Sequence, residues 1–363
     1  MRGSAAAGVA ACLLLTLLAV PLRPVPADAA DAPTSATGDD RAAADVLDAV
    51  VEASRSAAYE GRVVVATFSE RGPAVSEMRI TQWPDGELRV TRGEEWELGR
   101  VAGEGYLRSS PDTLLRLSGV ERTPFELDRL LRKYALDLGE STDLDTGPAR
   151  VVRVIERETG TRRERLHVDE ASGLVVRRET FDRDGDPVRV MAFTRLETHG
   201  AEVVQHDEDD LEVERRALTP ADTELLREEG FLVPDELPAG YVLVEVHEVE
   251  DAAVPTLHLI YSDGLYALSL YQQQGRLAAS AVDGAARLTT DDGGHVWRWP
   301  GSEPRRVVWT GDRLTFTALT DAPTDELLTV ASGLPTSRTG SILDRLARGL
   351  SRVGQWLTQN RSG

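Results

Sequence analysis

The residue types that carry enzyme chemistry occur in this chain without the spacing that catalysis requires. Gly103-Glu104-Gly105 lacks the third glycine of a dinucleotide-binding loop, and His247-Glu248 lacks the second histidine of a zinc-binding helix. The sequence contains no Gly-x-Ser-x-Gly segment and no phosphate loop that ends in Gly-Lys-Ser/Thr. We therefore expect that the protein is not an enzyme. The alternative is a hydrolase with two paired carboxylates, although nothing singles out a pair among the 61 acidic residues.

Two acidic segments offer oxygen and nitrogen ligands to a cation. His199 and His206 lie beside several acids, but the segment is more typical of a solvated linker. Residues 182–186 (Asp-Arg-Asp-Gly-Asp) resemble half of a calcium loop, yet the glycine comes one position early and the distal glutamate is missing. A hairpin turn is the better interpretation of this segment. We expect no metal and no cofactor.

The first 29 residues have the features of an export signal. Arg2 precedes an apolar run over residues 5–20, and Ala27-Asp28-Ala29 forms a small-x-small cleavage site. These features predict a signal peptide at residues 1–29 and a mature protein in the cell envelope or periplasm. No later segment is long and apolar enough to span a bilayer.

The only cysteine, Cys12, lies within this signal segment, so we expect no disulfide and no thiol nucleophile in the mature chain. Two alternatives stay open. Residues 9–12 resemble a lipoprotein box, although the apolar run mostly follows the cysteine rather than preceding it. An uncut segment would be a membrane anchor, although it is shorter than the ~20 residues that a spanning helix needs.

Charge and length narrow the function classes further. The net charge of -20 argues against nucleic-acid binding through a basic face and against general adsorption to anionic membranes. A length of 363 residues suggests two domains. Lys133 is the only lysine, which is typical of a GC-rich genome.

The first half of the chain alternates between helical and strand-like patterns. Residues 40–58 have the apolar spacing of a helix, and strand-like alternation then runs to residue 117, with Asp85-Gly86 as a tight turn. A second helix begins at Thr123-Pro124 with a Thr-x-x-Glu capping box, and strands resume over residues 150–193. Successive hairpins predict one large antiparallel sheet with helices gathered on one side.

Such a sheet has a concave inner face that must be lined by apolar side chains. Each candidate is individually more typical of a closed core, and the functional alternative is a cavity that takes an acyl chain, since each buried methylene contributes ~0.8 kcal/mol. The candidate lining residues are Val64, Phe68, Met78, Ile80, Trp83, Trp96, Tyr106 and Phe125.

An acidic segment separates this half from a second unit. The second unit has a short helix from Thr219-Pro220, six strand-like segments between residues 241 and 319, and a helix from Pro323 to Ala331. The predicted domain order is a flexible segment at 30–39, an N-terminal domain at 40–200, an acidic linker at 201–214, a C-terminal domain at 215–335, and a linker with an amphipathic helix at 336–363.

The terminal helix carries an apolar stripe that includes Leu346 and Leu350, flanked by Arg345, Arg348 and Arg352. It can fold back onto its own domain, dock on a partner, or make a peripheral contact with an anionic membrane. The sequence leaves these alternatives open.

The second unit resembles a known family. It carries Leu237-Pro238-Ala239-Gly240-Tyr241 and then Tyr261-Ser262-Asp263-Gly264-Leu265, which is similar to the C-terminal domain of the MucB/RseB family of extracytoplasmic sigma-factor regulators. The first unit is similar to the LolA-like domain of that family. The resemblance implies an α+β fold: a LolA-like antiparallel half-barrel sheet with helices on its inner side, a smaller C-terminal α/β domain, and a terminal amphipathic helix.

The resemblance also implies a function. Members of the family bind the extracytoplasmic segment of a membrane-spanning anti-sigma factor, shield it from proteolysis, and release it on a lipid-type signal. The positions expected to contact the partner are Tyr261, Asp263, Leu265 and Tyr271. The alternative is a carrier of lipids or lipoproteins in the cell envelope.

Overall fold

The computed structural model describes most of the chain between residues 39 and 336. The described ranges are 39–69, 72–83, 87–93, 96–101, 104–110, 113–117, 127–198, 220–249, 255–275, 277–290, 293–299, 305–311 and 313–336. The predicted signal peptide, the acidic linker at 201–214 and the terminal amphipathic helix lie outside these ranges. The domain boundaries therefore stay predictions.

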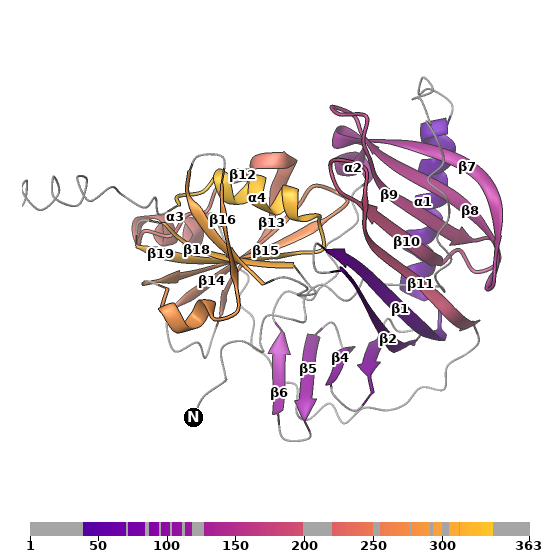
Figure 1. The fold of residues 1–363 in the computed structure, drawn as a ribbon, viewed down its shortest axis with the longest axis horizontal. Helices are drawn as coiled ribbons and strands as arrows, with labels where there is room; N and C mark the ends of the chain where they lie inside the picture. The colour runs from indigo at the N-terminus through magenta and orange to yellow at the C-terminus, as the bar shows by residue number, and fades with distance from the viewer. Residues whose placement is uncertain are drawn as a thin grey trace, which may run out of the picture.

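The N-terminal unit is an open antiparallel sheet of eleven strands, counted over the described residues (Figure 1). The strand order is β6-β5-β4-β3-β2-β1-β11-β10-β9-β8-β7. The strands are β1 (Tyr59–Ser69), β2 (Gly72–Gln82), β3 (Leu88–Arg92), β4 (Trp96–Val101), β5 (Glu104–Ser110), β6 (Thr113–Leu117), β7 (Tyr134–Leu144), β8 (Gly147–Glu156), β9 (Arg162–Asp169), β10 (Val175–Phe181) and β11 (Pro187–Thr198).

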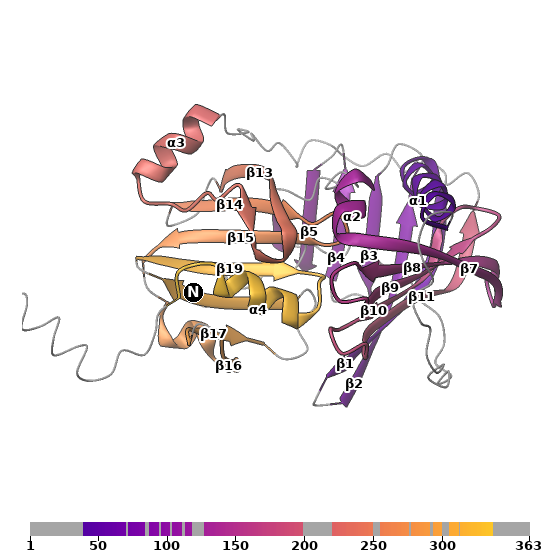
Figure 2. The ribbon, with the colours of Figure 1, turned by 90° about the horizontal axis from the view of Figure 1, so that it is seen from above.

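Two helices belong to this unit: α1 (Asp39–Ser56) and α2 (Leu127–Lys133). The apolar positions of α1, including Ala43 and Leu47, pack with Leu136 and Val152 of the sheet, as the helical spacing predicted. Figure 2 shows α1 against one face of the sheet and α2 between α1 and the C-terminal unit. The second predicted helix corresponds to α2, which ends at Lys133 because Tyr134 begins β7, and its predicted start at Thr123-Pro124 lies outside the described residues.

The centre of this sheet is the pairing of β1 with β11, which joins the two ends of the unit. The ring of Phe193 packs edge-on against Tyr59, at a centroid distance of 5.8 Å. A Cβ atom on Gly61 would lie 2.3 Å from this phenyl ring. Only glycine leaves room there for the aromatic pair.

The C-terminal unit is an antiparallel sheet of eight strands over the described residues, in the order β12-β13-β14-β15-β19-β18-β17-β16. Its elements are α3 (Pro220–Glu228), β12 (Glu236–Leu237), the short 3-10 helix η3 (Pro238–Gly240), β13 (Tyr241–Val249), β14 (Thr256–Ser262), β15 (Ala267–Gln274), the 3-10 helix η4 (Ala279–Val282), β16 (Ala286–Thr289), β17 (His295–Arg298), β18 (Arg305–Gly311), β19 (Leu314–Thr320) and α4 (Thr324–Ser332).

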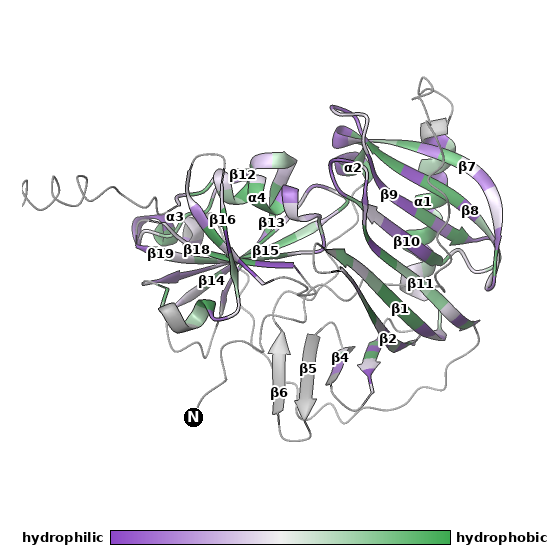
Figure 3. Ribbon diagram, in the orientation of Figure 1, coloured by the Kyte–Doolittle hydropathy of each residue, from purple (hydrophilic) through white to green (hydrophobic). Residues whose placement is uncertain are grey.

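The predicted fold class is confirmed: both units are antiparallel sheets accompanied by a few helices. The second unit is itself of the α+β type rather than α/β, since its paired strands are antiparallel and no helical crossover separates parallel neighbours. Apolar residues line the strands of both sheets in Figure 3. Within the described residues, no helix is long and apolar enough to cross a membrane.

Candidate functional site

The two units meet at a buried cluster of charged residues around Lys133, the only lysine of the chain. Lys133 ends α2, where the helix dipole favours a positive charge. Its Nζ atom donates hydrogen bonds to Asp263 Oδ2 at 2.7 Å and to Glu326 Oε1 at 3.1 Å. Both acceptors belong to the C-terminal unit, so this side chain of the first unit is held by the second.

Asp263, which binds Lys133, lies in a tight turn between β14 and β15. Its Oδ1 atom accepts hydrogen bonds from the backbone amides of Leu265 and Tyr266, at 2.9 and 2.8 Å. Its Oδ2 atom accepts from Tyr134 Oη at 2.6 Å as well as from the lysine. All four contacts are donated by N–H or O–H groups, and the carboxylate that accepts them is completely buried.

Gly264 lets this turn approach α2. Its φ is +94°, and a Cβ atom there would lie 2.3 Å from the backbone nitrogen of Leu130. The next residue, Leu265, packs against the apolar cores of both units. The turn at residues 262–265 therefore fits against α2 by shape as well as by charge.

Glu326 is the second acceptor and lies in the first turn of α4, where the helix dipole favours a carboxylate. It accepts hydrogen bonds from three donors: Lys133, Arg163 Nη2 at 3.1 Å and Tyr241 Oη at 3.0 Å. Burial raises the pKa of this carboxyl, whereas Lys133 and Arg163 oppose the rise. With three donors on its two oxygens, the ionised form is fully satisfied.

The electrostatics of the lysine follow from the same contacts. Burial works against its charge, but Asp263 and Glu326 outweigh burial and raise the pKa of Lys133 above its usual range. Burial, with the same two carboxylates, also raises the pKa of Tyr134 and Tyr241. Both tyrosines therefore stay protonated and act as hydrogen-bond donors.

Further ion pairs extend this contact between the units. Arg178 donates to both oxygens of Glu164 in its own unit and reaches Asp321 Oδ2 of the other unit at 3.4 Å. Arg163 also reaches Asp325 Oδ2 at 3.2 Å. We call the whole set the junction cluster: Lys133, Tyr134, Arg163, Glu164, Arg178, Tyr241, Asp263, Asp321, Asp325 and Glu326.

The four positions expected to contact a partner fall into two groups. Asp263 and Leu265 contact the N-terminal unit of the same chain. Tyr261 is buried and donates to the backbone oxygen of Pro234 at 2.9 Å, and Tyr271 stacks on His258 at 4.1 Å. Contact of these four residues with a partner stays a prediction.

Of the residues expected to line an apolar cavity, four lie on β1 and β2, Trp83 follows β2, Trp96 begins β4, Tyr106 lies on β5, and Phe125 lies outside the described ranges. Met78 and Ile80 are buried in the core with Val64 packed against it, and Phe68 is half-buried. Trp83 is buried, with the guanidinium of Arg89 5.5 Å from its ring centre. The side chains of Trp96, Tyr106 and Phe125 lie outside the description, so their role stays a prediction.

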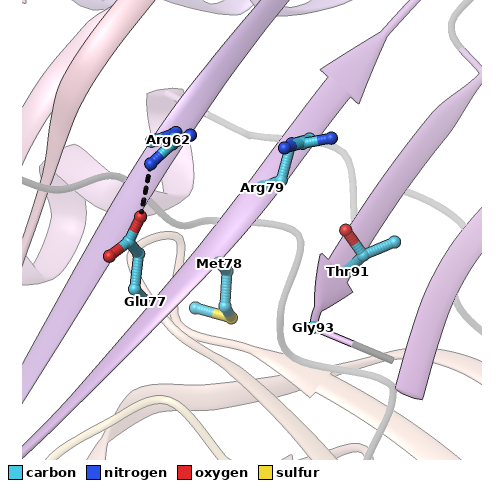
Figure 4. Close-up of a pocket in the computed structure, with 6 residues that line it drawn as sticks. All are labelled: Arg62, Glu77, Met78, Arg79, Thr91 and Gly93. Atoms are coloured by element: carbon cyan, nitrogen blue, oxygen red, sulfur yellow. Dashed lines mark hydrogen bonds and ion pairs between the residues drawn. The ribbon is translucent and has the colours of Figure 1, made fainter. Parts of the chain in front are cut away.

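A hollow of about 310 Å³ lies where β1, β2 and β3 meet (Figure 4). An ion pair between Arg62 and Glu77, 3.4 Å long, crosses it. Its lining is mostly polar and consists of Arg62, Glu77, Met78, Arg79, Thr91 and Gly93. A single methionine does not make this hollow an acyl-chain site.

The structure describes only one of the two segments considered as cation sites from the sequence, residues 182–186. Asp182 Oδ1 accepts hydrogen bonds from the amides of Asp184 and Asp186, and Gly185 has a φ of +85°, so this segment is a hairpin turn as predicted. His199 and His206 lie outside the described ranges. Among the residues that the structure describes, no group of three or more His, Cys, Asp or Glu side chains could hold a metal ion.

Sequence reasoning missed the junction cluster, although its signals were visible. The presence of only one lysine was interpreted as an effect of genome composition, whereas this residue, Lys133, lies at the centre of the cluster. The two segments that carry the family resemblance both converge on it, one through Tyr241 and the other through Asp263. Arg163 and Glu326 had no local signal, because each depends on a contact across more than a hundred residues.

Fold and site together define a class: a protein of two joined antiparallel sheets, with a charged junction and no catalytic motif in its sequence. Residues 115–221 match the family model described as the MucB/RseB N-terminal domain. Over residues 115–221, this match agrees with the family that the resemblance predicted.

Solved structures of MucB are among those whose fold is similar to that of this chain. The Pseudomonas aeruginosa MucA/MucB complex is 20% identical, covers 83% of this chain and 100% of that chain, and has a TM-score of 0.49. A crystal structure of MucB is 21% identical, with 82% and 98% coverage and a TM-score of 0.45. A LolA superfamily protein from Nitrosomonas europaea is 10% identical, with 45% and 94% coverage and a TM-score of 0.23. No curated protein matches the sequence.

Proposed function

We propose that this protein is an extracytoplasmic negative regulator that binds the outer segment of a membrane anti-sigma factor. Binding shields that segment from proteolysis, and a lipid-type signal releases it. The observation that carries the proposal is the match of residues 115–221 to the MucB/RseB N-terminal domain. The protein acts by binding and not as an enzyme.

The joined sheets support a binding role. The junction cluster fixes the two units against each other, so a partner can contact both units at once without ordering them first. The proposed location is the cell envelope or periplasm, reached through the signal peptide at residues 1–29. The proposed partner contacts are Tyr261, Asp263, Leu265 and Tyr271.

The proposed lipid signal is an acyl chain on the inner face of the first sheet. Met78, Ile80 and Trp83 are buried, whereas Val64 and Phe68 are half-buried. The register of β1 with β2 places Val64 and Phe68 on the opposite face of the sheet from Met78 and Ile80. A ligand that binds the released form more tightly than the bound form shifts the equilibrium by the ratio of the two affinities.

The test is a binding assay with the purified chain and the outer segment of the anti-sigma factor encoded beside it. We expect binding at micromolar concentration or tighter, and slower cleavage of the segment by the protease that attacks it. The variant Asp137→Asn changes a surface ion pair with Arg153 and should bind normally. Absence of binding at micromolar concentration would contradict the proposal.

The second candidate function is a carrier of lipids or lipoproteins. The observation that favours it is the open sheet with α1 against one face, a layout that can enclose an acyl chain when its core loosens. Native mass spectrometry of the protein from its own host should then show bound lipid. A lipid-free spectrum would exclude the carrier.

A further inference from the structure

The two segments of the C-terminal unit that carry the family resemblance, residues 237–241 and 261–265, both lie beside Lys133 of the N-terminal unit. The Ser262–Leu265 turn supplies Asp263, which binds Lys133 at 2.7 Å. In the 3-10 turn at residues 238–240, a Cβ atom added to Gly240 would lie 3.7 Å from Cδ of Lys133, and the next residue, Tyr241, donates to Glu326. These segments therefore form a socket for the end of α2.

The charges on the two sides of this contact are complementary. The N-terminal unit contributes four cations, Lys133, Arg163, Arg178 and Arg183, and one carboxylate, Glu164. The C-terminal unit contributes four carboxylates, which are Asp263, Asp321, Asp325 and Glu326. Separation of the units would leave a basic face on one and an acidic face on the other.

We propose that the junction is a latch with two states: closed, with Lys133 in the socket of Asp263 and Glu326, and open, with the two units apart. Intermediate states are disfavoured because each would leave a buried charge without its partner. Asp263 is completely buried and Glu326 is 3% exposed, so neither carboxylate can exchange the lysine for water without movement of a whole unit.

The latch also fixes how the proposed partner is bound. This step rests on the proposed function. Two of the four expected partner positions, Asp263 and Leu265, belong to the turn that holds α2. We infer that the closed latch sets the relative orientation of the surfaces that the anti-sigma segment contacts, so that an open latch weakens this binding.

The single lysine makes the opening directly measurable. An N-hydroxysuccinimide acetate ester acylates free amines, so in this chain it reports only on Lys133 and on the terminal amine. In the native full chain, Lys133 should be acetylated slowly, because its Nζ is bound by two carboxylates and its side chain is 16% exposed. Peptide mass spectrometry separates the two sites, and the terminal amine serves as the internal rate standard.

The decisive variant is Asp263→Asn. The remaining side-chain oxygen still accepts from the amides of Leu265 and Tyr266, so the turn persists. The negative charge that Asp263 presents to Lys133 is lost. We expect Lys133 to be acetylated about tenfold faster or more, which corresponds to the loss of one hydrogen bond between charged groups. Glu326→Gln should accelerate acetylation in the same direction.

The matched control is Asp137→Asn, which makes the same chemical change at a carboxylate that pairs with Arg153 away from the junction. Its acetylation rate at Lys133 should equal that of the native chain. Equal rates in the native chain, Asp263→Asn and Glu326→Gln would overturn the latch, as would rapid acetylation of Lys133 in the native chain.

A binding measurement distinguishes failure of the latch from failure of the proposed function. With the anti-sigma segment, Asp263→Asn should bind about tenfold more weakly than Asp137→Asn. If the native chain fails to bind the segment, the proposed function is wrong, while acetylation still decides the latch. If binding is unchanged in Asp263→Asn although acetylation is faster, the latch opens but does not control the partner, and that part of the inference is wrong.

Discussion

Lys133 shows how one side chain can serve as the meeting point of two folding units. Its Nζ atom lies over the rings of Tyr134 and Tyr241, 4.9 and 5.6 Å from the ring centres, and is bound by two buried carboxylates. A buried pair of this kind adds little net stability compared with apolar groups, but removal of one partner is costly. The lysine therefore acts mainly on specificity, because it defines which surfaces of the two units fit.

We predict that Lys133→Met destabilises the chain by about 3–5 kcal/mol, because it leaves Asp263 buried without a cation and removes one of the two cations that pair with Glu326. Denaturant unfolding measures this loss. The control is Arg62→Met, whose partner Glu77 has a side chain that is 59% exposed, so its cost should stay below ~1 kcal/mol. Equal costs for the two variants would show that the junction charges are not coupled.

His167 of β9 makes stability depend on pH. Burial lowers the pKa of His167 to about 4, and Arg177 and Arg165 add to this effect while Glu179 opposes it. The folded chain therefore holds the neutral ring where the unfolded chain, with a pKa near 6.5, binds a proton. The stability contribution is complete above pH 6.5 and is lost as the pH falls towards 4.

We therefore expect the native chain to lose up to about 3 kcal/mol between pH 7 and pH 4 through this one group. His167→Leu should remove this loss, because the buried ring nitrogens have no hydrogen-bond partner for a leucine to displace. Unfolding by urea at several pH values measures the slope. The same slope in both proteins would mean that other groups control the acid sensitivity.

At the scale of elements, the β14–β15 turn packs against α2 of the other unit. Gly264→Ala would place a methyl group 2.3 Å from the backbone of Leu130, so it must push α2 away. Gly284→Ala is the matched control, because Gly284 also has a positive φ, +75°, but nothing within 4 Å. The control should cost about 1 kcal/mol of backbone strain, and Gly264→Ala clearly more, in thermal unfolding.

This contrast also shows what sequence can and cannot predict. Alternation predicted β2 and β14, and apolar spacing predicted α1 and α4, because those signals are local. The junction was not predictable, since the Lys133–Glu326 bond depends on how two finished units fit together. Likewise, burial of Met78 and Ile80 was expected from the pattern, while what lies opposite them depends on the curvature of the whole sheet.

At the scale of the whole molecule, the junction cluster joins two units that each have their own apolar core. We predict that calorimetry of the native chain shows one cooperative transition, because the open state of the latch carries unpaired charges. The double variant Asp263→Asn/Glu326→Gln should show two transitions, one for each unit. Two transitions in the native chain would mean that the units unfold independently despite the cluster.

The strand order of the first sheet also has a consequence for how the chain folds. Most of its pairings join neighbouring strands, so the hairpins can form early and locally. The pairing of β1 with β11 is different, because Tyr59 must find Thr198. Closing such a long loop costs entropy before any contact is gained, so this pairing should be the slow, final step. A growing polypeptide therefore cannot complete its first sheet until Thr198 has been synthesised, and until then β1 exposes an edge that invites aggregation.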